Sequence, residues 1–107
     1  MRLSDNENRA LKQLREELFN RYSIIDFRIY GSKARAEERQ DSDLDVMIEL
    51  PEYDMAIVEE IDDIVYRINL ECDVLISALV FGKDELEDGP MSESPIYKVI
   101  QMEGVPL

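Results

Sequence analysis

The chain has no histidine, no tryptophan and a single cysteine, Cys72. Histidine is the commonest transition-metal ligand and the commonest general base, so its absence argues against a zinc site and against catalysis by a histidine. One cysteine cannot form a disulfide within the chain. Acid–base and metal chemistry would therefore fall mainly to carboxylates.

Long apolar runs are missing as well. No segment approaches the roughly 20 consecutive apolar residues that a membrane-spanning helix needs. Residues 1–5 also lack the basic and then apolar pattern of a secretory signal peptide. We therefore expect a cytoplasmic protein that does not contact a membrane.

Positive charge is scarce, because 12 lysine and arginine residues stand against 25 aspartate and glutamate residues, for a net charge of −13. This balance disfavours direct binding to nucleic acid and suits a basic protein partner. A substrate that carries phosphate would need a local exception to this charge. The nearest candidate is the segment 31–39, with Lys33, Arg35 and Arg39.

At 107 residues, of which 45% are hydrophobic, the chain has enough apolar material for one small core. We expect a single domain, 1–107. Ser4 and Glu7 form a capping-box pattern that opens a helix ending near residues 20–23. Apolar and polar residues then alternate over 25–30, which predicts a strand.

The following elements are predicted in the same way. A short helix should occupy 33–39, a strand 43–50, and a long helix the segment after Asp54. The alternation over 72–77 predicts a third strand that carries Asp73.

The rest of the chain contains breakers and one more helix. Residues 82–90 are polar and acidic and contain a Gly-Pro pair, so we expect them to be the least ordered internal stretch. Ser94 and Pro95 are typical of a helix start, and Gly104 of its end.

Two aspartates on the predicted strand 43–50 point to metal chemistry. Because alternate side chains of a strand face the same side, Asp43 and Asp45 would share one face, opposite the apolar residues of the strand. Their mutual repulsion favours a bound cation, and oxygen ligands suit Mg²⁺. An outer, solvated face of an edge strand remains an open alternative.

A calcium-binding loop is an alternative for the same segment. Asp41, Asp43, Asp45 and Glu52 fall at the ligand spacing of such a loop, but its sixth position, which needs glycine for a sharp turn, holds Val46. This interpretation is therefore disfavoured.

Together these residues resemble the minimal nucleotidyltransferases of the DNA polymerase beta superfamily. The matching positions are Gly31-Ser32, Ala34-Arg35, Ser42-Asp43, Asp45 and Asp73. The short length and the ending over 94–104 look like the MNT antitoxins that accompany HEPN-domain RNase toxins. The family's usual glycine after the Ala-Arg pair is replaced by Ala36.

The resemblance implies an α/β (α+β) nucleotidyltransferase fold, in which a small mixed β-sheet is flanked by helices. It implies that Gly31, Ser32 and Arg35 bind the triphosphate of ATP. It further implies that Asp43, Asp45 and Asp73 are catalytic and ligate Mg²⁺, as two ions.

The implied activity is transfer of AMP from ATP to a tyrosine hydroxyl of a partner HEPN toxin, with release of pyrophosphate and neutralisation of the toxin. The implied assembly is a hetero-oligomer. Two alternatives remain open: a non-catalytic antitoxin that masks the toxin by binding, and a nucleotidyltransferase acting on a small molecule. The second is disfavoured because the chain is short for building its own acceptor pocket.

Overall fold

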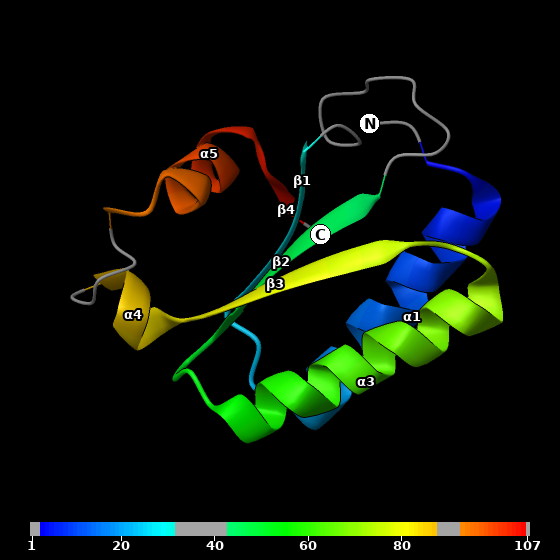
Figure 1. Ribbon diagram of the computed structural model, residues 1–107, viewed down its shortest axis with the longest axis horizontal. Coiled ribbons are helices and arrows are strands. Elements are labelled where there is room, and N and C mark those ends of the chain that lie inside the picture. The colour runs from blue at the N-terminus through cyan, green and yellow to red at the C-terminus, as the bar shows by residue number, and fades with distance from the viewer. Residues whose placement is uncertain (1–2, 32–42, 88–92, 107) are drawn as a thin grey trace.

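The computed structural model describes residues 3–31, 43–87 and 93–106. Within these ranges the chain forms, in order, α1 (Asp5–Arg21), β1 (Asp26–Tyr30), β2 (Leu44–Leu50), α3 (Met55–Cys72), β3 (Ile76–Gly82), α4 (Lys83–Glu87), α5 (Pro95–Glu103) and β4 (Val105–Pro106). The strands form a four-stranded sheet in the order β3-β2-β1-β4 (Figure 1).

The sheet is mixed, and β2 is one of its two inner strands. β1 runs antiparallel to β2 and to β4, whereas β2 and β3 are parallel. A parallel pair needs a long crossover, and α3 supplies it. The prediction of a small mixed sheet flanked by helices is confirmed.

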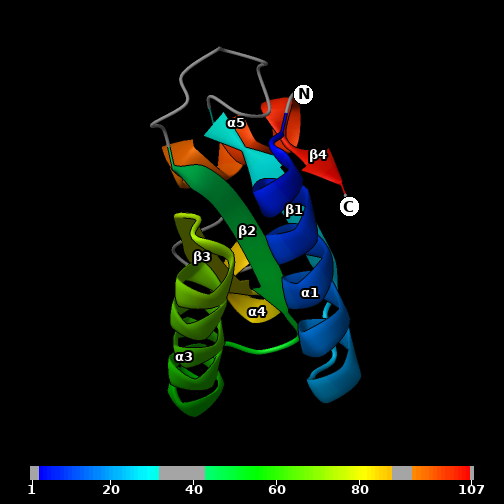
Figure 2. The same ribbon diagram turned by 90° about the vertical axis from the view of Figure 1, so that its right-hand side faces the viewer.

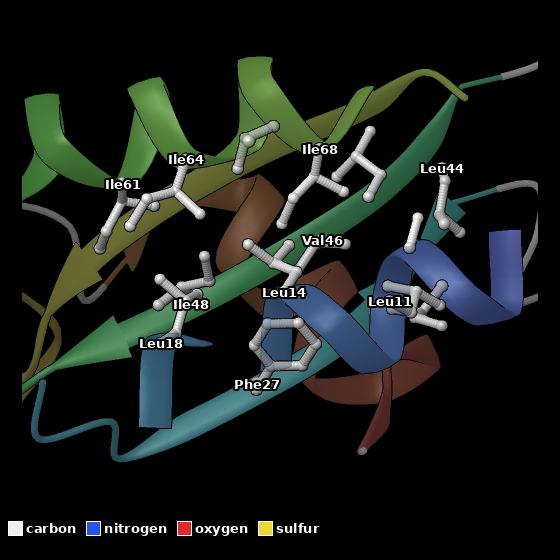
Figure 3. Close-up of a cluster of buried hydrophobic side chains, with 14 of the residues drawn as sticks. Leu11, Leu14, Leu18, Phe27, Leu44, Val46, Ile48, Ile61, Ile64 and Ile68 are labelled. Atoms are coloured by element: carbon white, nitrogen blue, oxygen red, sulfur yellow. The ribbon is translucent and has the colours of Figure 1, made fainter. Parts of the chain in front are cut away.

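Helices α1 and α3 pack side by side on one face of the sheet (Figure 2). Their apolar stripes meet the inward side chains of β1 and β2, and Figure 3 shows Val46 and Ile48 enclosed between the two helices. The members of this core include Leu11, Leu14, Leu18, Phe27, Ile29, Leu44, Val46, Ile48, Ile61, Ile64 and Ile68.

The other face of the sheet is partly covered by the C-terminal elements. Ile100 of α5 and Leu86 of α4 pack on Met47 and Phe81 in a second, smaller buried cluster. Met47 shares its face of β2 with Asp45, because the two residues are two apart on the strand. The candidate acids therefore lie on the face that carries α5.

Helices α1 and α3 start with the predicted side-chain caps, whereas Ser94 before α5 makes no side-chain capping bond. The Ser4 side chain accepts a bond from the Glu7 backbone N–H at 3.1 Å, and the Glu7 carboxylate accepts one from the Ser4 N–H at 2.9 Å. Asp54 accepts a bond from the Ala56 N–H at 3.0 Å, and Pro95 lies in the first turn of α5. These caps satisfy backbone donors that have no partner within a helix.

The predicted strand over 72–77 was wrong in its position. Helix α3 continues to Cys72, Asp73 follows in the left-handed conformation with φ 53°, and β3 begins at Ile76. Cys72 fits both the helical spacing of the apolar residues before it and the alternation of the residues after it. Its burial with Ile61, Ile64 and Ile68 in the core under α1 favours the helix.

The prediction of little order over 82–90 was also wrong for its first part. Gly82 ends β3 and α4 covers Lys83–Glu87, while residues 88–92 lie outside the described ranges. In the described residues, none of the helices is both long enough and apolar enough to cross a membrane.

Asn69 of α3 clamps the outer edge of β3. Its side chain accepts a bond from the Ile76 N–H at 2.9 Å and donates one to the Ile76 carbonyl at 3.1 Å. On the inner side, the Leu44 N–H donates to the Leu75 carbonyl at 2.9 Å. These contacts fix where β3 starts relative to both α3 and β2.

We expect Asn69→Ala to lower the free energy of unfolding by about 1–3 kcal/mol, because both backbone groups of Ile76 lose their partner. Urea denaturation followed by circular dichroism measures this, with Asn20→Ala on an exposed position of α1 as the control. An Asn69→Ala protein within 0.5 kcal/mol of the parent, a threshold typical of surface changes, would contradict the clamp.

Candidate functional site

The two aspartates lie where β2 begins. Asp43 directly precedes the strand and Asp45 is its second residue, and both are partly buried. Because β2 is paired on both sides, the alternative of a solvated face on an edge strand was wrong. The strand conformation of Val46 likewise agrees with rejecting the calcium-binding loop.

One row of side chains crosses three strands at this level. Asp45 is the register partner of Tyr30 on β1 and of Ser77 on β3. Register partners in a sheet project to the same face. Asp45 is therefore flanked by a phenol on one side and by an exposed serine hydroxyl on the other.

Gly31, directly after the end of β1, lies close to the Asp45 carboxylate. Its φ of 76° lies in the left-handed region, and a Cβ built there would be 2.5 Å from Asp45 Oδ2. Both the conformation and the close approach require glycine. The predicted turn residue and the predicted acid are thus brought into direct proximity.

Asp73 does not share this row. It is exposed in the turn between α3 and β3, and Ser77 occupies the β3 position beside Asp45. No three Asp, Glu, Cys or His side chains in the described residues are grouped so as to hold a metal ion. The structure therefore joins Gly31 and Asp45 but does not assemble the three aspartates into one such group.

The predicted residues Ser32 and Arg35, with Lys33, Ala36 and the helix expected over 33–39, lie outside the described residues. Their roles toward a phosphate stay predictions.

Tyr30 is a neutral phenol near pH 7, and its surroundings favour that form further. Burial, and to a smaller extent the Asp45 carboxylate, raises the pKa of the Tyr30 phenol above its ordinary value. A protonated phenol beside a carboxylate adds no negative charge to the site. The negative charge of the row is therefore that of Asp45.

A second pair of acids lies on the same face at the far end of the sheet. Asp26 and Glu49 are register partners, and Asp26 accepts a bond from Arg28 Nε at 2.6 Å. Burial first, and then the charge of Asp26, raises the pKa of Glu49. This pair has the Arg28 guanidinium beside it.

A shallow hollow of about 320 Å³ lies between α1 and α3, on the opposite side of the sheet. It is lined by Arg21, Glu60, Asp63, Ile64 and Arg67. Arg67 pairs with Glu17 and Glu71, so its charge is already compensated. The row at the start of β2 remains the better candidate for chemistry.

The donors at this level are oxygen atoms: the carboxylate of Asp45, the carboxylate of Asp43 just before the strand, and the hydroxyl of Ser77. Hard oxygen donors fit Mg²⁺, which prefers one or two carboxylates together with phosphate oxygens and water. The residues present therefore fit a divalent cation that a phosphate substrate also contacts.

Sequence reasoning missed Ser77 and gave Tyr30 no role. Tyr30 is placed beside Asp45 by the register of β1 with β2. Ser77 is placed there by the register of β3 with β2, and local alternation misplaced the start of β3. The signal that could have identified Ser77 was the helical spacing of Ile61, Ile64, Ile68 and Cys72, which carries α3 past the predicted strand start.

Comparison with protein families gives one finding. A family model described as Nucleotidyltransferase domain matches residues 11–103. A comparison with curated proteins gave no match. The matched segment contains the whole candidate row and the turn before it.

We expect Gly31→Ala to displace the Asp45 carboxylate, because its Cβ would meet Oδ2, and to weaken Mn²⁺ binding by about tenfold while costing about 1–2 kcal/mol of stability. Mn²⁺ binding by electron paramagnetic resonance and a thermal melt measure the two effects. Gly31→Asn is the matched variant, since asparagine tolerates positive φ better but carries the same Cβ. Wild-type binding in either variant would show that the close approach does not matter.

We expect Glu49→Gln to stabilise the protein near pH 7.5 and to lose this advantage toward about pH 5. A raised pKa in the folded state means that folding favours protonated Glu49, so stability falls as pH rises above the ordinary value of 4.5. Urea denaturation at the two pH values measures the difference, with exposed Glu52→Gln as the control. An equal effect at both values would refute the assignment.

Proposed function

Because the chain belongs to the nucleotidyltransferase domain family, whose activity is nucleotidyl transfer, we propose that it is an antitoxin-type protein adenylyltransferase. It moves AMP from ATP to a tyrosine hydroxyl of a partner HEPN RNase toxin and so neutralises the toxin. The observation that carries the proposal is the contact of Gly31 with Asp45, which puts a tight turn against a candidate cation ligand.

In this proposal each part of the site has a role. Gly31, with Ser32 and Arg35, holds the triphosphate of ATP. Asp43 and Asp45 would hold Mg²⁺, as two ions, and the metal would neutralise charge that develops on the transferred phosphoryl group. The acceptor tyrosine hydroxyl gives its proton to a carboxylate of the site, its oxygen attacks the α-phosphorus, the bond from the α-phosphorus to the β-phosphate oxygen breaks, and pyrophosphate leaves.

The proposed acceptor is a protein, and two features support this. The acidic chain, with its net charge of −13, suits the basic surface that an RNA-cleaving partner needs. Helix α5, on the sheet face of Asp45, exposes Ile96, Val99 and Met102 by 40%, 41% and 87%. Apolar side chains of this kind are typical of protein contacts, so we propose a cytoplasmic hetero-oligomer with the toxin.

A non-catalytic antitoxin that masks the toxin is the second candidate. It is favoured by the absence of Asp73 from the β3 position beside Asp45. Fewer carboxylates at a cation site weaken cation binding and with it the chemistry. Binding through α5 and the acidic surface would then neutralise the toxin without transfer.

The deciding experiment is the intact mass of a HEPN toxin after incubation with this protein, ATP and Mg²⁺. We expect adenylyl-sized increments whose rate falls to below about one hundredth in the Asp43→Asn/Asp45→Asn double variant. Asp62→Asn/Asp63→Asn on the exposed face of α3 makes the same change of charge and serves as the control. A toxin that stays unmodified but is bound and silenced would establish the masking mechanism instead.

A further inference from the structure

We propose that Ser77, and not Asp73, occupies the third position of the cation site beside Asp45 and Asp43. The inference rests on the proposed function in that it takes Asp43 and Asp45 as cation ligands. It adds that the protein itself supplies two carboxylates and one neutral hydroxyl, so that the triphosphate has to supply further negative charge.

The register of the parallel pair carries the assignment. Leu44 pairs with Ile76, Asp45 with Ser77 and Val46 with Ala78. Ile76 and Ala78 belong to the core under α3, whereas Leu79 and Phe81 belong to the cluster under α5. By alternation, Ser77 projects to the face of Asp45, and it is exposed there.

Asp73 is kept out of that position by three local features. It lies four residues before Ser77, it has the left-handed φ of 53° that ends α3, and the next residue, Val74, donates its N–H to the Asn69 carbonyl at 3.2 Å. The side-chain clamp of Asn69 on Ile76 then sets the start of β3. To bring Asp73 opposite Asp45, β3 would have to slip by four residues along β2. The slip would break the bond from Val74 to Asn69 and the clamp of Asn69 on Ile76.

The consequence is one of charge. Two carboxylates balance one divalent cation, and a serine hydroxyl adds an oxygen donor but no charge. Affinity for a hard cation rises with the number of charged ligands. The protein alone should therefore hold Mg²⁺ or Mn²⁺ weakly, and binding should tighten when a triphosphate contributes its own oxygens.

The experiment measures Mn²⁺ binding by electron paramagnetic resonance in about 0.1 M KCl, a salt level that screens the diffuse attraction of an acidic surface. We expect Ser77→Asp to tighten Mn²⁺ binding by at least about tenfold, because it completes a set of three carboxylates. Ser77→Asn is the matched control, similar in size and uncharged, and should not reproduce the tightening because it adds no charge.

The Asp73→Asn variant is a second test, and its outcome does not depend on how the Ser77 variants fold. It should leave the Mn²⁺ affinity within about twofold of the parent. Circular dichroism melts accompany every variant. Tightening in Ser77→Asp together with an unchanged Asp73→Asn supports the assignment. Weakening in Asp73→Asn as large as in Asp45→Asn overturns it, as does a folded Ser77→Asp with parental affinity.

The Asp43→Asn/Asp45→Asn double variant separates failure of this inference from failure of the proposed function. If it binds Mn²⁺ as the parent does, the cation site on β2 is wrong, and the proposed function fails together with the assignment of Ser77. If it loses binding while Ser77→Asp gains none, the assignment of Ser77 alone fails.

Discussion

The structure depends on the pairing of β2 on both sides. Because β1 and β3 flank it and helices cover both faces over its middle, β2 is buried along most of its length, and its polar side chains are confined to Asp45 and Glu49. An acid on an inner strand is retained only where it has a partner or a ligand. Gly31 packs its backbone against Asp45 where β1 ends and β2 begins, and this contact makes that end of the sheet the candidate site.

Much of the fold could be predicted from the sequence, because local signals and tertiary packing agree over most of the chain. The capping box at Ser4, the cap at Asp54 and the alternation along β1 and β2 each have one physical solution that also buries the apolar face. The same alternation placed Asp43 and Asp45 together. Their assignment as cation ligands remains a prediction that the geometry makes chemically reasonable.

The rest could not be predicted where two periodicities overlap. Cys72, Val74 and Ile76 read as a strand, yet Cys72 also continues the helical stripe of α3, and only packing against α1 decides between them. The predicted start of β3 was four residues too early. For this reason Asp73 was predicted to lie in the site, and Ser77 was not identified as a site residue. The short strand β4 and the cover that α5 provides for Met47 are long-range features without a local pattern.

The Asn69 clamp also has an evolutionary consequence. It ties helix phase to strand register, because one side chain of α3 holds both backbone groups of Ile76 across a seven-residue separation. A lineage that gained or lost one codon between these two residues and kept the clamp would shift β3 by one residue and turn each of its side chains to the opposite face of the sheet. Such a shift would move Ile76 out of the core and Ser77 into it, so the clamp makes the spacing between Asn69 and Ile76 intolerant of single-residue insertions and deletions.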